Sequence, residues 1–151
     1  AKIDVTRTAL SAQMDDVLLD PGNPSLGGVQ RFTYTPSGAA TSGNDGFFIK
    51  ASTGKADDTV VLDTRDSTEE DTRFSSIDLS TGEGSDVVFI AGNNIAKVDA
   101  GAGDDMVAVE GDGIVYGGDG NDLIYARTAS GDAGDDVIYS DGFASGGDGS
   151  D

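Results

Sequence analysis

The sequence predicts an all-β protein built as a parallel β-solenoid, and three observations lead to this fold class. A nine-residue pattern of Gly-rich turn, Asp and short apolar strand recurs from residue 81 onward. Short β-forming segments without that turn lie between the units. The sixth-position Asp residues are 14 to 19 residues apart. Such a period fits two strands of about four to six residues and two turns, which together make one coil of a solenoid.

Five units align in register along the second half of the chain. They are Thr81–Phe89, Ala100–Ala108, Gly117–Tyr125, Gly131–Tyr139 and the incomplete Gly146–Asp151. Each unit has glycines in the turn and an Asp at the sixth place, and the complete units have an aliphatic residue at the eighth. We expect the eighth position to face the core and the seventh and ninth positions to face outward, because side chains alternate along a strand.

The same turns have the chemistry of a site for a hard cation. Calcium takes about six to eight oxygen ligands, and Gly-rich turns can direct carbonyl oxygens toward an ion. Facing rows of Asp on stacked coils repel one another unless a cation lies between them. We therefore expect metal at these turns in preference to plain turn chemistry.

The nine-residue pattern resembles the repeat of RTX (repeats-in-toxin, haemolysin-type) calcium-binding proteins. Gly117–Tyr125 matches at every defined place, whereas Asp132 replaces the second Gly of its unit. The resemblance implies a right-handed parallel β-roll that holds several Ca²⁺ ions between successive coils. It also implies that the ions take oxygens from the Gly region and the sixth-position Asp. The implied metal residues are Gly82, Gly84, Asp86, Gly101, Gly103, Asp105, Gly118, Gly120, Asp122, Gly134, Asp136, Gly147, Gly149 and Asp151.

Only alternate half-coils carry the motif, so we expect one row of ions along one edge of the roll. Asp112 and Asp141 fall on the opposite edge and are expected to be solvated turn residues.

Composition excludes several classes of function. The formal net charge is −19, with 24 Asp against 4 Glu, which argues against nucleic-acid binding and against an anionic membrane surface. The chain has no Cys and no His, so triad catalysis and ordinary zinc sites are absent. No apolar run approaches the roughly 20 residues that span a bilayer. We expect no enzyme activity, because nothing singles out a catalytic pair among the acids.

The first part of the chain lacks the complete nine-residue pattern. Leu10, Met14, Val17 and Leu18 have helical spacing, which predicts a short capping helix over about 7–19. The alternative is a degenerate strand repeat, because residues 14–19 echo the later units. Residues 29–35 alternate and predict a strand, so 1–41 is expected to form an N-terminal cap.

Residues 42–80 are expected to form degenerate coils of the same solenoid. Gly54–Leu62 keeps the Asp-Asp pair and the apolar strand, and Ser42–Ile49 keeps only the centre of the pattern. The polar stretch near 64–73 is expected to be an insertion loop. Residues 81–151 then form the calcium-binding β-roll, which stops inside a repeat, so we expect the native chain to continue.

The outward positions predict an apolar stripe that includes Phe89, Met106, Tyr125 and Tyr139. Either this stripe contacts another copy or a neighbouring domain, or its side chains shield one another along the sheet. The resemblance to RTX proteins implies a calcium-loaded structural module of a secreted or cell-surface bacterial protein, such as a surface layer or adhesin. The alternative is a folding and secretion module of an RTX enzyme or toxin whose catalytic domain lies elsewhere.

Overall fold

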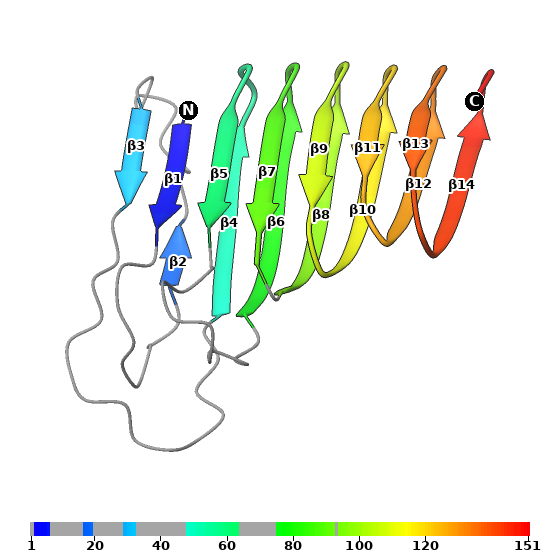
Figure 1. Ribbon diagram of the computed structural model, residues 1–151. Coiled ribbons are helices and arrows are strands. Elements are labelled where there is room, and N and C mark those ends of the chain that lie inside the picture. The colour runs from blue at the N-terminus through cyan, green and yellow to red at the C-terminus, as the bar shows by residue number, and fades with distance from the viewer. Residues whose placement is uncertain (1, 7–16, 20–28, 33–47, 64–74, 93) are drawn as a thin grey trace.

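A computed structural model of the 151-residue chain shows a β-solenoid made of two parallel seven-stranded sheets (Figure 1). The structure describes residues 2–6, 17–19, 29–32, 48–63, 75–92 and 94–151. We call the two sheets odd and even, after the numbers of their strands. The odd sheet contains, in spatial order, β13 (Val137–Tyr139), β11 (Leu123–Tyr125), β9 (Met106–Val109), β7 (Val87–Ala91), β5 (Thr59–Asp63), β1 (Lys2–Thr6) and β3 (Val29–Phe32). The even sheet contains β14 (Phe143–Asp148), β12 (Thr128–Ala133), β10 (Asp112–Asp119), β8 (Asn94–Ala102), β6 (Ser75–Glu83), β4 (Phe48–Gly54) and β2 (Val17–Leu19).

From β4 onward the chain alternates between the sheets, so each even strand and the odd strand after it make one coil. The coils stack in the register that the repeats predict. Ile124, for example, pairs with Val107 on one side and with Ile138 on the other. The parallel β-solenoid is therefore confirmed, and the strands between the motif units form the even sheet.

The predicted alternation of side chains is also confirmed. The eighth-position residues Val88, Val107 and Ile124 are at most 1% exposed and lie in the core between the sheets. Ile138 is only partly buried, because β13 is the last strand of the odd sheet. Residues at the seventh and ninth positions lie on the outside.

The core becomes narrower from the N-terminal to the C-terminal coils. Successive aligned Asp residues are 28, 19, 17, 14 and 15 residues apart, so the later coils are shorter. Core side chains shrink in step: along one column of the even sheet Leu79 is followed by Val98, Val115 and Ala129. Another column runs Thr81, Ala100, Gly117 and Gly131. Side-chain volume thus matches coil length, as close packing requires.

The predicted capping helix over 7–19 is wrong at its C-terminal end. Val17–Leu19 forms the strand β2, which pairs in parallel with β4, while residues 7–16 lie outside the described residues. Three consecutive apolar residues there gain backbone partners from the edge of β4, as the alternative strand interpretation expected. The strand predicted over 29–35 is confirmed for Val29–Phe32, and residues 33–35 lie outside the described residues.

The degenerate coils join the solenoid through β4 and β5. Gly54 ends β4 and Thr59 begins β5, so Gly54–Leu62 forms a turn and strand equivalent to the later units. In the later units the apolar strand of the motif lies in the odd sheet. Phe48 and Ile49 instead lie in β4 of the even sheet. Residues 42–47 and the insertion loop predicted near 64–73 lie outside the described residues.

Candidate metal centre

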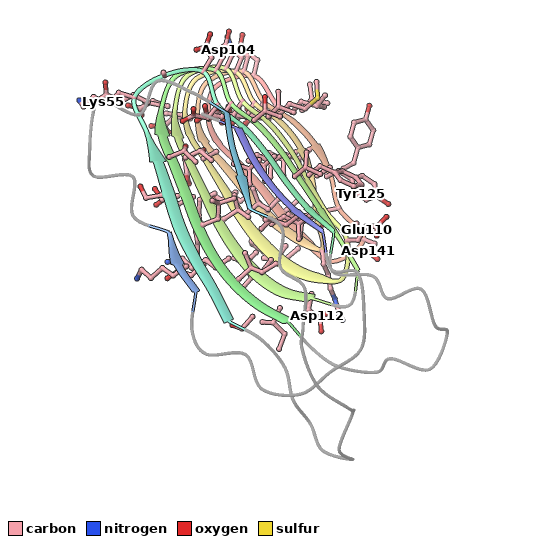
Figure 2. The ribbon with its side chains drawn as sticks, turned by 90° about the vertical axis from the view of Figure 1, so that its left-hand side faces the viewer. Lys55, Asp104, Glu110, Asp112, Tyr125 and Asp141 are labelled. Atoms are coloured by element: carbon pink, nitrogen blue, oxygen red, sulfur yellow. The ribbon has the colours of Figure 1, made fainter. Side chains whose placement is uncertain are left out.

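The fourteen sequence-predicted metal residues lie in the last residues of the even strands and in the turns that follow them. These turns stack along one edge of the solenoid, at the top of Figure 1. Figure 2 shows Asp104 at the same edge and Asp112 at the opposite one. The structure therefore brings the predicted residues together as one row and leaves the other edge without the motif.

The glycines at the second and fourth positions make this stacking possible. Gly118 has φ +112° and Gly120 has φ +134°, values that L side chains rarely adopt. A Cβ at Gly118 would overlap the carbonyl oxygen of Gly101 in the preceding coil. A Cβ at Gly120 would overlap the carbonyl oxygen of Gly103 in the same way. Each turn thus presents carbonyl oxygens toward the next, in space that only glycine leaves open.

Asp132 is the exception to this rule. It takes the second-position place of a glycine with φ +76°, as the one non-Gly residue with positive φ in the described part of the chain. The hydroxyl of Ser130 donates to its Oδ1 at 2.6 Å. The carbonyl oxygen of Asp132 still lies where a Cβ at Gly147 would overlap it, so this turn keeps the shared backbone geometry.

The sixth-position residues form what we call the aspartate column. Its buried members, each at most 3% exposed, are Asp58, Asp86, Asp105, Asp122 and Asp136. In each pair of neighbouring coils, the backbone N–H of one Asp donates to Oδ1 of the Asp in the following coil. The distance is 2.7 Å from Asp86 to Asp105 and 2.9 Å from Asp105 to Asp122. The last link, from Asp136 to Asp151, measures 3.2 Å.

The second carboxylate oxygen of the column has no such partner. Oδ2 is buried and makes no hydrogen bond within the described residues at Asp86, Asp105, Asp122 and Asp136. At Asp122 and Asp136 a first-position glycine leaves room for Oδ2, since a Cβ at Gly117 would overlap Oδ2 of Asp122 and one at Gly131 would overlap Oδ2 of Asp136. Buried polar atoms without partners are rare in native proteins, so this column of oxygens requires an explanation.

The burial of these carboxylates changes their acidity. Burial raises the pKa of Asp105 and of Asp122 to about 6, although the backbone hydrogen bonds that they accept lower it. Neighbouring carboxylates, among them Asp86 beside Asp105 and Asp136 beside Asp122, add to the rise. Burial also raises the pKa of Asp86, although the neighbouring Thr81 hydroxyl lowers it. The charged form of the column is therefore disfavoured unless a positive charge compensates it.

A second ladder of hydrogen bonds at the fifth position was not predicted. Here the direction is reversed, because the side chain of one coil accepts from the backbone N–H of the following coil. The backbone N–H of Asn121 donates to Oδ1 of Asp104 at 2.8 Å, and that of Asp135 donates to Oδ1 of Asn121 at 2.8 Å. Asp or Asn recurs at this place in several units, but the exposed side chains resemble ordinary turn residues in the sequence.

Acidic side chains alone do not make a metal site here. Within the described ranges, no three His, Cys, Asp or Glu residues are placed to hold an ion. Each coil contributes one buried carboxylate, so a cation at this edge would need backbone carbonyl oxygens as further ligands. The turns offer these, and calcium accepts such a mixed set of oxygens. On the opposite edge, Asp112 pairs with the guanidinium of Arg127, and both Asp112 and Asp141 are exposed as expected.

No protein family, curated protein or solved structure matches this chain. Among the described residues, no helix has the length and hydrophobicity needed to cross a membrane.

Proposed function

We propose that this chain is a calcium-binding structural β-roll module of a secreted or cell-surface protein, and that it folds when calcium binds. One observation carries the proposal: the aspartate column contains four buried carboxylate oxygens that make no hydrogen bond within the described residues. These oxygens lie beside turns whose carbonyl oxygens are directed from coil to coil.

The electrostatics of the column favour a cation. Two buried carboxylates in neighbouring coils repel each other, and either protons or a bound cation can relieve that repulsion. At neutral pH protonation is incomplete, because the pKa values of Asp105 and Asp122 are about 6. A cation between successive coils would compensate the charge and use Oδ2 as a ligand.

Calcium fits this set of oxygens better than magnesium. Magnesium requires near-ideal octahedral geometry at about 2.0–2.1 Å and gives up water reluctantly. Calcium tolerates irregular sets of carbonyl and carboxylate oxygens. The sites would lie between Asp86 and Asp105, between Asp105 and Asp122, and between the two following pairs of the column.

The proposed role follows from coupling between ion binding and folding. Without calcium, a chain with a net charge of −19 is expanded by its own repulsion. Calcium that binds only the coiled form stabilises that form by mass action. Millimolar external calcium would therefore drive coiling after export, and the rigid roll would then space or present other parts of the protein.

The test is far-UV circular dichroism of the chain during a calcium titration, with magnesium as the control ion. We expect a cooperative rise of β signal with calcium and little change with magnesium. Calorimetric titration of the same sample should give more than one ion per chain. A β spectrum that is already complete in chelator, with no heat of calcium binding, would show that the turns are structural and would refute the proposal.

A further inference from the structure

The outer face of the odd sheet carries an exposed apolar surface. At the seventh position Val87, Met106, Leu123 and Val137 are 37–50% exposed. At the ninth position Phe89, Tyr125 and Tyr139 are 37–60% exposed. Because the coils stack in register, these seven side chains form two adjacent columns, which we call the apolar stripe. Contiguous apolar surfaces of this kind mark contact sites on proteins.

A cleft of about 200 Å³ lies at one end of the stripe, on the edge opposite the Gly-Asp turns. It is lined by Val109, Glu110, Tyr125, Arg127, Tyr139 and Asp141, among others. Figure 2 shows Tyr125, Glu110 and Asp141 on the same side of the solenoid. The two tyrosines belong to both the stripe and the cleft, so the two features form one continuous surface.

The charge of the cleft is negative. Among the described residues that line it, Arg127 is the one basic residue, and its guanidinium pairs with Asp112. Glu110 is held in place by the backbone N–H of Gly92, which donates to Oε2 at 3.1 Å. Two aromatic rings beside two carboxylates suit an ammonium or guanidinium group, which gains both ion pairing and cation–π attraction.

We propose that the apolar stripe and this cleft bind a basic, apolar segment of another protein. Apolar side chains of that segment would pack on the stripe, and a Lys or Arg would enter the cleft between Tyr125 and Tyr139. Charge complementarity selects this partner over a second copy of the chain. Two copies, each with a net charge of −19, would bring carboxylates such as Glu110 and Asp141 against like charge.

The inference rests on the proposed function only in requiring the folded roll. Binding is therefore measured at saturating calcium and, where circular dichroism shows a fold in chelator, in chelator as well. Failure of calcium dependence and failure of partner binding are then separate results. The probe is a short alternating lysine–leucine peptide, and its binding is measured by fluorescence anisotropy at about 0.15 M salt, where weak long-range attraction is screened.

Two double variants and one matched control decide the outcome. Tyr125→Ser with Tyr139→Ser, and Glu110→Gln with Asp141→Asn, should each weaken peptide binding by about tenfold or more. The control is Tyr116→Ser with Asp99→Asn, an exposed tyrosine and an exposed carboxylate on the even sheet, which should change the affinity less than about twofold. Circular dichroism confirms that each variant is folded.

Three results would overturn the proposal. If a lysine–serine peptide of equal length binds equally well, the binding depends on net charge alone and not on apolar contacts with the stripe. Equal losses in the control variant would place binding elsewhere. A dimer in light scattering that dissociates on Tyr125→Ser with Tyr139→Ser would make the stripe an interface between copies of this chain.

Discussion

The backbone N–H of Asp105 donates a hydrogen bond to Oδ1 of Asp122 in the following coil, at 2.9 Å. This single contact fixes the carboxylate of Asp122 inside the turn and leaves its Oδ2 buried without a hydrogen-bond partner. The fold therefore needs each Asp as an acceptor, while the charge on that Asp opposes the fold unless a cation is present. Substitutions that separate these two roles test the proposed function directly.

Asp122→Asn should act in opposite directions with and without calcium. Asn keeps an Oδ1 acceptor for Asp105 but removes a buried charge whose pKa is raised to about 6. In chelator at pH 8 the folding equilibrium should shift toward the coiled form by about 1–2 kcal/mol, the gain from lost charge being partly offset by the unpartnered amide N–H. The affinity for calcium should fall by about tenfold, because a charged ligand is lost.

Asp119→Asn is the matched control for that variant. Asp119 lies in the same turn, is exposed, and carries the same charge. The β signal in chelator and the calcium titration by calorimetry should both be nearly unchanged. If Asp122→Asn lowers stability in chelator as much as in calcium, its carboxylate is a structural acceptor alone.

Acidification should stabilise the metal-free roll. The pKa of Asp105 and of Asp122 is about 6 in the folded chain against 3.8 for a free carboxyl group, so the folded state binds more protons between these values. The resulting stabilisation is complete below pH 3.8 and is lost as pH rises through about 6. Each carboxylate should contribute on the order of 1–3 kcal/mol between pH 7 and pH 4.

With calcium bound, the same acidification should destabilise the roll, because protons compete for the ligand oxygens. The folded fraction from far-UV circular dichroism, measured from pH 4 to pH 8 in calcium-depleted and in calcium-saturated buffer, should therefore change in opposite directions. The double variant Asp105→Asn with Asp122→Asn should flatten the metal-free profile. Parallel profiles in the two buffers would contradict a shared site for protons and calcium.

The sequence predicts the second half of the fold well because each residue there has the same role in every coil. The alternation at Val107, Ile124 and Tyr125 follows from the strand period, and the parallel register follows from the repeat. The prediction failed at Val17–Leu19, where helical spacing and a short strand fit the same residues. Pairing with β4 decides between them, and this pairing depends on an edge that local sequence does not reveal.

The candidate site was predictable in its residues but not in its hydrogen bonds. The repeat places Asp105 and Asp122 in one row, but their backbone-to-carboxylate link requires knowledge of how the coils stack. The narrowing of the core from Leu79 to Ala129 was equally hidden, because it appears only when columns of different coils are aligned. The hydrogen bonds and side-chain packing between coils, rather than the register of the coils, are the part that the sequence did not reveal.

Gly118→Ala and Gly54→Ala form a pair that isolates the contact between coils. Both glycines take the second position with nearly the same φ, +112° and +118°. A Cβ at Gly118 overlaps the carbonyl oxygen of Gly101, whereas a Cβ at Gly54 meets no atom of the described residues within 4 Å. Gly54→Ala should cost about 1–2 kcal/mol from backbone strain alone, and Gly118→Ala about 1–3 kcal/mol more.

Chemical denaturation in calcium measures both variants against the parent chain. The larger loss in Gly118→Ala should appear together with a lower calcium affinity, since the overlapping carbonyl belongs to the proposed ligand set. Equal losses of stability in the two variants would mean that the coils separate at this edge without an energetic penalty. The overlap at Gly118 would then give no support to carbonyl oxygens as ligands.

Asp132→Gly should stabilise the roll, because it restores glycine at a position with φ +76°. The substitution relieves left-handed strain and removes a like charge that raises the pKa of Asp122. It loses the hydrogen bond from Ser130, which is exposed and contributes little. We expect a net gain of about 0.5–1 kcal/mol in the free energy of unfolding, measured by denaturation in calcium. Asp132→Asn removes the charge and keeps Cβ and an acceptor for Ser130, so the difference between the two variants is the relieved backbone strain less that weak hydrogen bond. Asp132→Ala removes the same charge but keeps Cβ and loses the hydrogen bond, so it should gain less than either variant. If Asp132→Asn and Asp132→Gly raise the free energy of unfolding equally, the whole effect comes from the charge, and Asp132 fits this turn without strain.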